Sequence, residues 1–274
     1  MTKKYQIGLI IIGDEILSGK RMDQHFENSK KILSKRGIPI TWVVKVGDEK
    51  KLCEQFLRFS FLNMDSIVFC FGGIGSTPDD NTRQACADAL GVNLSLNSEA
   101  EKLIKEKFKK LNISITSERL QMGEFPFGSK IIPNLHSNIP GFSIKNHYFL
   151  PGFPQMAGPM MEWVLEKNHQ NIFSDFVEVE YFFQIDSLYE SSITPTLNQI
   201  VKNYQNIKVY SLPNSNPDKG LKTNFTLELG IKMSGHYEKI TFQDKLLFDK
   251  AINDLKKEIV FLGGVIINEG KVKR

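Results

Sequence analysis

A glycine-rich segment holds the residues whose types and spacing are best suited to chemistry. Residues 72–80 have the sequence GGIGSTPDD and directly follow an apolar run, SIVFCF, at residues 66–71. Glycines let the backbone turn tightly and present its N–H groups without a Cβ in the way, and hydroxyl groups add further donors. We therefore predict a phosphate-binding loop whose ligand-binding residues are Gly72, Gly73, Gly75, Ser76 and Thr77.

Carboxylates accompany glycines in three separate loops. The segments GDEILSG (13–19) and GDE (47–49) follow two other apolar runs and repeat the combination of glycine and acid found at 72–80. Acids beside a phosphate site are useful when a divalent cation such as Mg²⁺ bridges the two, as in phosphoryl or nucleotidyl transfer. We predict that Asp48 and Asp80 are catalytic and hold the metal. The accompanying acids are Asp14, Glu15 and Asp79.

Simpler structural roles account for some of these residues. Asp80 stands just before a predicted helix and would cap its N-terminus, and the same role suits Asp48. His25 and His136 are more often structural or surface residues than ligands, while Arg83 could steady a phosphate or lie on a solvated helix face. The glycine-rich loop lacks the lysine of a Walker A loop and the spacing of a dinucleotide fingerprint, which excludes both motifs.

The elements that must position these loops alternate between strand and helix. Short apolar runs predict strands, and apolar residues at helical spacing predict helices. The predicted strands are 5–12, 40–46, 66–71, 130–132 and 148–150, and the predicted helices are 23–35, 50–62, 81–90, 99–111 and 154–166. This order predicts a three-layer α/β/α fold with a mostly parallel sheet. Loops that follow parallel strands emerge at one sheet edge, so the three acidic loops should meet there.

A second, smaller domain is predicted after a change of composition near residues 168–174. Strand, helix, strand, strand, helix and strand follow in turn, at about 176–185, 187–203, 207–211, 224–233, 242–259 and 265–267. This order predicts a small α+β domain of split βαβ type. We therefore expect domains at 1–170 and 175–274. The second has no GxxG clamp in a basic setting, so a dimerisation or lid role is favoured over nucleic-acid binding.

Composition narrows the class of protein. The chain has 274 residues, 41% apolar and 24% charged, which is ordinary for a soluble globular protein. Its net charge of +4 is not gathered into a dense basic run, so nucleic acid is not a favoured partner. No apolar stretch is long enough to cross a membrane, and the run at 6–12 fits a buried strand better than a signal peptide. The scattered thiols of Cys53, Cys70 and Cys86 suit a reducing cytoplasm.

Three separated motifs, in order, resemble a known family. GDEILSG (13–19), GGIGSTPDDNTRQACADALG (72–91) and LPGFP (150–154) are similar to the MoaB/Mog domain shared by molybdopterin adenylyltransferases and the N-terminal half of CinA-type proteins. The resemblance covers about residues 5–166 and is greatest to the CinA-like branch, which carries a small KH-like domain next. The chain ends where a full CinA protein continues into its deamidase domain, so we expect that activity to be absent.

The resemblance implies a ligand and a choice of activities. The ligand is molybdopterin, another pterin or a nucleotide, with its phosphates on the loop at 72–75. Family members transfer adenylate to molybdopterin with magnesium and ATP, or cleave a pyrophosphate such as that of ADP-ribose with a divalent metal and potassium. A homo-oligomer, dimer or trimer, is also implied. The resemblance adds these cofactor-binding residues: Asp14, Glu15, Pro140, Gly141, Pro151 and Gly152.

The chain departs from the family pattern in three places. Asp23-Gln24-His25 replaces the usual Asp-Thr-Asn, and residues 134–141 (NLHSNIPG) replace a segment with a flexible glycine and a small residue. The acid often found after LPGxP is missing, since Gln155-Met156 stand there. These changes leave two hypotheses open: a metal-dependent hydrolase or transferase, and a module that binds a pterin or nucleotide without chemistry.

Overall fold

The computed structural model describes residues 5–62, 65–173, 176–204, 206–214, 226–236 and 240–273. The chain divides into two compact units, Met1–Phe173 and Ser174–Arg274. Each unit has hydrophobic core clusters of its own, built from residues of that unit alone. Within the described ranges, no helix is both long and apolar enough to pass through a lipid bilayer.

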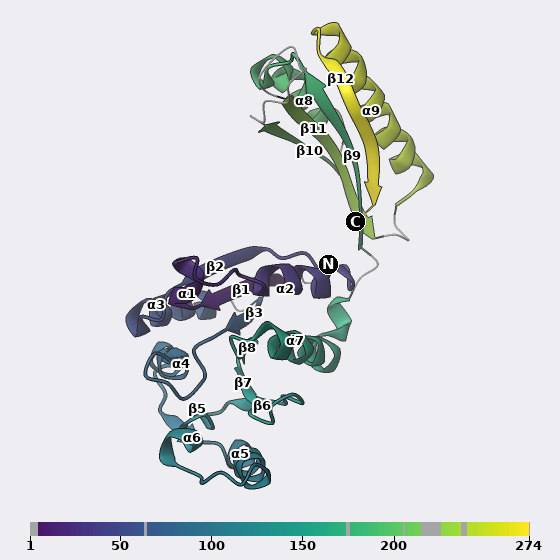
Figure 1. Ribbon diagram of the computed structural model, residues 1–274. Coiled ribbons are helices and arrows are strands. Elements are labelled where there is room, and N and C mark those ends of the chain that lie inside the picture. Colours follow the sequence, from purple (N-terminus) through teal and green to yellow (C-terminus); the bar gives the residue numbers. More distant parts are fainter. Residues whose placement is uncertain are drawn as a thin grey trace. The chain divides into compact units, whose positions relative to one another are not determined.

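The first unit is built on a six-stranded sheet with the order β2-β1-β3-β8-β7-β6 (Figure 1). Strands β2, β1, β3 and β8 run parallel, whereas β7 runs antiparallel to both of its neighbours. The predicted mostly parallel sheet is therefore confirmed. The strands are β1 (Gln6–Ile12), β2 (Trp42–Val46), β3 (Ser66–Phe71), β6 (Lys130–Ile132), β7 (Gly141–Ile144) and β8 (His147–Leu150).

Helices cover both faces of this sheet, which explains why its central strands are apolar on both sides. Alternate residues of β1 and β3 pack with α2 (His25–Ser34) and α7 (Pro154–Asn168) in one core cluster. The residues between them pack with α3 (Lys50–Leu62) and α4 (Thr82–Leu90) in another. A short 3₁₀ helix, Gln170–Ile172, follows α7. The result is the predicted three-layer α/β/α arrangement.

The strand directions bring several loops to one edge of the sheet. Because β2, β1, β3 and β8 are parallel, the loops that follow them leave from the same edge. The first of these loops contains the short helix α1 (Asp14–Leu17). Strand β7 is antiparallel, so the loop at 133–140 that precedes it lies at this edge too. The three acidic loops therefore meet, as expected.

Residues 94–126 form a small lobe beside the sheet. Its elements are β4 (Leu94–Leu96), α5 (Ser98–Lys110), α6 (Ser117–Gln121) and β5 (Glu124–Pro126), and β4 pairs with β5. Ile104, Phe108 and Met122 form its hydrophobic cluster. The sequence predicted α5 but not the other three elements, since segments of three to five residues carry too little periodicity to be recognised.

The second unit is a four-stranded antiparallel sheet with the order β10-β11-β9-β12, which is the split βαβ order. Residues of both of its helices contribute to one core cluster with residues of the sheet. The predicted start of a strand at 224–225, and residue 175 of the predicted domain, lie outside the described residues. The elements are β9 (Phe176–Asp186), α8 (Glu190–Asn203), β10 (Ile207–Asn214), β11 (Thr226–His236), α9 (Phe242–Phe261) and β12 (Val265–Lys273).

Candidate functional site

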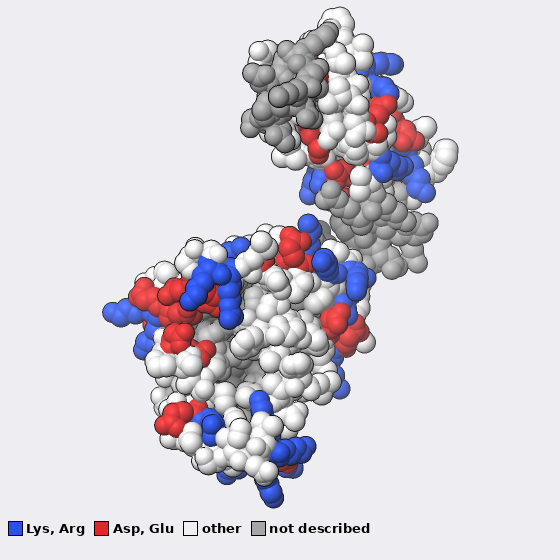
Figure 2. Space-filling model, in the orientation of Figure 1, with Lys and Arg blue, Asp and Glu red and all other residues white. Residues whose placement is uncertain are grey.

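A pocket of about 810 Å³ opens at the edge of the sheet where the loops meet. Its volume suits a ligand of nucleotide size. Figure 2 shows a group of acidic side chains bordering an uncharged hollow on one face of the first unit. The predicted site residues that line the pocket are Glu15, Asp48, Gly72, Gly73, Gly75, Ser76, Thr77, Asp80, Pro140, Pro151 and Gly152.

Two predicted site residues, Asp14 and Gly141, are not among those lining the pocket. The Asp14 carboxylate accepts the backbone N–H of Asp48 (3.2 Å), and the Asp48 carboxylate accepts that of Asp14 (2.9 Å). This reciprocal pair fixes the first acidic loop to the second. Gly141 is buried in β7, where an added Cβ would lie 2.3 Å from the backbone oxygen of Phe149. Both residues have structural roles in the wall behind the pocket.

Three carbonyl groups of the glycine-rich loop point away from the pocket, because hydrogen bonds from the start of α4 hold them there. Thr82 donates its backbone N–H to the carbonyl of Gly73 (3.0 Å) and its hydroxyl to that of Gly72 (3.1 Å). Arg83 donates from Nη2 to the carbonyl of Gly75 (2.7 Å). The first residues of α4 thus fix three peptide groups of the loop.

The same peptide groups present their N–H groups in the opposite direction. No described peptide bond is cis, and in a trans peptide the N–H points away from the carbonyl. Across the described part of the chain, the backbone N–H groups of residues 73–76 find no hydrogen-bond acceptor. Four consecutive free donors beside the N-terminus of a helix form a concavity suited to an anion. We call these four N–H groups the cradle.

The cradle requires glycine at two positions. Gly72 and Gly73 have φ values of 101° and 66°, which side-chain-bearing residues rarely adopt. An added Cβ would lie 2.3 Å from the backbone oxygen of Ile12 at the first position and 2.0 Å from Thr82 Oγ1 at the second. Conformation and space therefore both demand glycine there.

Asp80 closes the end of the glycine-rich loop. Its Oδ2 accepts hydrogen bonds from the backbone N–H (2.8 Å) and hydroxyl (2.6 Å) of Thr77. Helix α4 has Asn81 at its N-cap, without a side-chain capping bond. The alternative role of Asp80 as a helix cap is thus not seen, because its carboxylate turns back to Thr77 instead.

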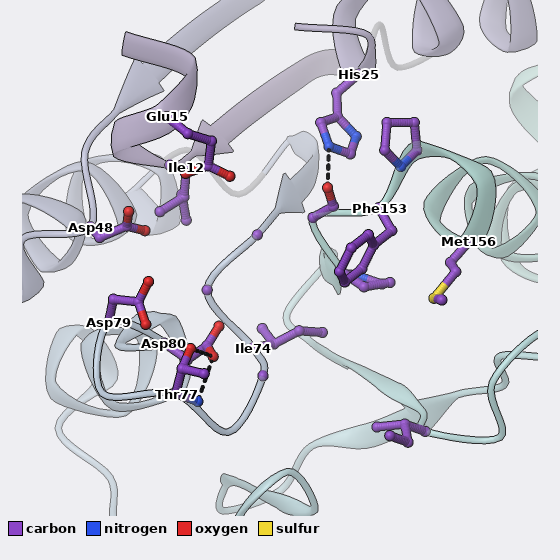
Figure 3. A pocket seen from close by; sticks show the side chains of 18 of the residues that line it. Ile12, Glu15, His25, Asp48, Ile74, Thr77, Asp79, Asp80, Phe153 and Met156 are labelled. Carbon is purple, nitrogen blue, oxygen red and sulfur yellow. Dashed lines mark hydrogen bonds between the residues drawn. The ribbon is translucent and has the colours of Figure 1, made fainter. Parts of the chain in front are cut away.

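Acidic side chains form one wall of the pocket (Figure 3). Glu15, Asp48, Asp79 and Asp80 lie along this side. Burial raises the pKa of the Asp48 carboxyl, and the negative charges of Asp14, Glu15 and Asp79 raise it further, against the lowering effect of its bond from the Asp14 N–H. The wall therefore carries an excess of negative charge that a cation would stabilise.

Aromatic and apolar side chains form the opposite wall, with His25, Phe153 and Met156 on it (Figure 3). His25 is buried, stacks on Phe71 with ring centroids 4.7 Å apart, and donates from Nε2 to the carbonyl of Gly152 (3.3 Å). Burial lowers the pKa of its imidazole, which favours the neutral form near pH 7. His25 has a structural role and also borders the pocket. His136 is exposed and is not among the lining residues.

Two positions were considered for Arg83 from the sequence, a contact with phosphate and a solvated helix face, and it occupies neither. It is 8% exposed, and its guanidinium donates to the backbone carbonyls of Gly75 and Gln121. Burial lowers its pKa, while the charges of Asp80 and Glu124 oppose that effect. The residue therefore braces the cradle from behind. No local sequence signal distinguishes such an arginine from a surface one, because its partners are backbone carbonyls of two separate loops.

Several lining residues were not recognised from the sequence. Asn134 had a usable signal: its Oδ1 accepts the N–H groups of His136 (3.1 Å) and Ser137 (3.3 Å), an asparagine turn that the segment NLHS permits. The others are brought to the pocket by tertiary folding, which periodicity does not report. They include Ile16, Arg21, Met22, Gln24, Ile74, Lys107, Met122, Ile139, Phe153, Pro154 and Met156.

Comparisons with known proteins agree with this fold. Residues 8–170 match the family model described as "Probable molybdopterin binding domain". A protein of Sulfurisphaera tokodaii is 32% identical over 266 residues, which cover 94% of this chain and 97% of that protein. A protein of Saccharolobus islandicus is 29% identical over 264 residues, which cover 95% of this chain and 97% of that protein. The crystal structure of CinA from Thermoplasma acidophilum, described as of unknown function, has 24% identity and a TM-score of 0.53, over 59% of this chain and 97% of that one.

Proposed function

The chain belongs to the MoaB/Mog molybdopterin-binding domain family, as a CinA-like member, and from this we propose that it binds a pterin or nucleotide through a phosphate. We propose further that it uses a divalent metal to act on a pyrophosphate linkage. The observation that carries the proposal is the cradle, whose four N–H groups find no acceptor among the described residues. It belongs to a loop that lines a pocket with one acidic and one apolar wall. The apolar wall suits an aromatic ring, and the cradle suits a phosphate.

The acidic wall has the chemistry that a magnesium ion requires. Asp48 and Asp80 each use Oδ2 in a hydrogen bond, while neither Oδ1 accepts one within the described ranges. Among the residues that the structure describes, no group of three or more histidine, cysteine or acidic side chains could hold a metal alone. That fits Mg²⁺, which commonly takes one or two carboxylates and completes its shell with substrate phosphates and water.

Each part of the chain then has a defined task. The cradle holds the phosphate and stabilises charge that develops on it. Asp48 and Asp80 supply carboxylate oxygens to the metal, which when bound would polarise the phosphate and activate water. The apolar wall around Phe153 excludes water from the ring of the ligand. The family resemblance also implies a homo-oligomer, a dimer or trimer, which multi-angle light scattering would test.

The test compares the wild-type chain with Asp80→Asn. An asparagine oxygen can still accept both bonds from Thr77, so the loop should stay folded while a charged metal ligand is lost. The chains are incubated with ADP-ribose, ATP, NAD or FAD and with Mg²⁺, Mn²⁺ or Co²⁺, with and without potassium, and the products are identified by mass spectrometry. We expect the variant to lose at least about 100-fold in turnover, since charge stabilisation is a large catalytic contribution.

Three outcomes would change the proposal. Full activity in Asp80→Asn would remove that residue from the chemistry. A wild-type chain whose melting temperature rises with ligand, but which returns the ligand unchanged with every metal, would support a binding module without catalysis. Molybdopterin belongs in the same thermal-shift series, since stabilisation by molybdopterin alone would favour a role in molybdenum cofactor biosynthesis.

A further inference from the structure

One lysine of α5 differs from the other four. Lys107 is half-buried and lines the pocket, whereas the other four lysines of the helix are exposed. Lys105, for example, pairs with Glu101 (2.6 Å). No carboxylate of the described residues lies within salt-bridge distance of Lys107. Burial also lowers the pKa of its ammonium group. The pocket thus contains a partly desolvated cation whose charge is not compensated. The other lysines are Lys102, Lys105, Lys109 and Lys110.

The lobe that carries α5 is fastened to the cradle. The guanidinium of Arg83 donates to the carbonyl of Gly75 (2.7 Å) and also to that of Gln121 at the end of α6. The glycine-rich loop and the lobe therefore bind the same planar guanidinium, and only the width of that group lies between them. Met122 follows Gln121 directly and lines the pocket. This places the pocket-facing side of the lobe next to Gly75 and the N–H of Ser76.

Packing then fixes Lys107 on the same side. Met122 and Phe108 belong to one hydrophobic cluster, and the Lys107 ammonium lies 5.7 Å from the centroid of the Phe108 ring. Lys107 and Met122 both line the pocket. The lysine that the glycine-rich loop itself lacks is therefore supplied from α5, about thirty residues later in the chain.

We propose that Lys107 binds the second phosphate of a diphosphate ligand whose first phosphate occupies the cradle; this rests on the proposed function and specifies its substrate class. The charges of the pocket determine the direction of the diphosphate. Without a metal, Glu15, Asp48, Asp79 and Asp80 repel a second phosphate from the acidic wall, and Lys107, which also lines the pocket, attracts it. Arg21 also lines the pocket, but its backbone N–H binds the carbonyl of Glu15, at the acidic end.

The experiment measures the binding of ADP and of AMP by calorimetry, in EDTA, to the full chain and to two variants. Lys107→Met removes the cation and keeps the apolar stem, and Lys105→Met is the matched control on the same helix. We expect wild type to bind ADP about tenfold more tightly than AMP, the scale of one charge-assisted contact. Lys107→Met should lose that preference and keep its AMP affinity within about twofold. Lys105→Met should match wild type.

Each other result counts against the inference. An ADP to AMP ratio unchanged in Lys107→Met would overturn it while leaving the cradle intact. An equal loss of affinity for both probes would mean that Lys107 serves the first phosphate or the fold, and circular dichroism would separate those two. If Lys107→Arg also lacks the preference, the charge is not the cause. A wild type that binds neither probe in EDTA would overturn the inference, which needs no metal, and titration with Mg²⁺ would then test the cradle separately.

Discussion

The carbonyl of Gly75 accepts a 2.7 Å hydrogen bond from a buried arginine, and this contact has consequences for the anion site in front of it. Arg83 fixes the orientation of the peptide group that presents the N–H of Ser76 to the pocket. It also places a positive charge behind that peptide, where few solvent molecules screen it. A group that never contacts the ligand can therefore raise anion affinity by orienting and polarising the groups that do.

We predict that Arg83→Met destabilises the chain by about 2–4 kcal/mol, because two backbone carbonyls lose a charged donor. Urea unfolding followed by circular dichroism measures the change. Arg58→Met is the control, since the Arg58 side chain is 57% exposed and its bonds to the Glu54 carboxylate and the Asp88 carbonyl are exposed to solvent, so its loss should cost about 1 kcal/mol or less. Similar losses in both variants would show that the buried contacts of Arg83 contribute nothing particular to stability.

Residue types that are demanded by local backbone geometry were predicted from the sequence, and residues placed by tertiary contacts were not. Gly72 and Gly73 could be identified because their conformations with positive φ require glycine wherever the loop lies. Lys107 and Met156 look like ordinary members of amphipathic helices, and only folding brings them to the pocket. Asp14 was assigned to the ligand because it stands in an acidic loop; its carboxylate accepts the backbone N–H of Asp48, and it is not among the residues that line the pocket.

Among the helices and strands, the longer ones were predicted from the sequence and most of the shortest ones were missed. The apolar runs of β1 and β3 were predicted to within a residue, since burial on both faces leaves a continuous signal. The predicted end of the helix 81–90 is also confirmed, since α4 ends at Leu90 with Gly91 in the left-handed conformation at its C-cap. Strand β7 was missed, because four residues within a segment rich in glycine, proline and asparagine carry no period. That strand begins at Gly141, directly after the pocket-lining residues Ile139 and Pro140, so the missed strand anchors one side of the pocket.

The junction of β3 and α4 gives a prediction at the scale of elements. Gly73 and Gly91 have the same φ, 66°. A Cβ added at Gly73 would lie 2.0 Å from Thr82 Oγ1, whereas a Cβ added at Gly91 would meet no atom within 4 Å. Gly91→Ala should cost about 1 kcal/mol, from backbone conformation alone. Gly73→Ala should cost at least about 2 kcal/mol, because it must also displace Thr82.

The same pair separates stability from binding. Displacing Thr82 frees the carbonyls of Gly72 and Gly73 and lets the cradle rotate. Gly73→Ala should therefore lose ADP binding at temperatures where it is still folded, whereas Gly91→Ala should retain it. Calorimetry below the unfolding transition measures this. Unchanged ADP affinity in Gly73→Ala would contradict the assignment of the cradle.

At the scale of the whole molecule, the two units have separate cores. The core cluster of the second unit spans residues 183–259 and includes no residue of the first, and the three clusters of the first include none of the second. Every residue that lines the pocket belongs to Met1–Phe173. The site should therefore depend on the first unit alone.

This separation predicts the behaviour of the chain when it is divided. A protein of residues 1–173 should unfold in one cooperative transition and bind ADP within about threefold of the full chain, because independent domains keep their own cores. Residues 174–274 alone should fold and bind no ADP. Calorimetric unfolding and titration of both pieces measure these expectations. Loss of ADP binding by a folded 1–173 protein would mean that the second unit contributes to the site, directly or through assembly.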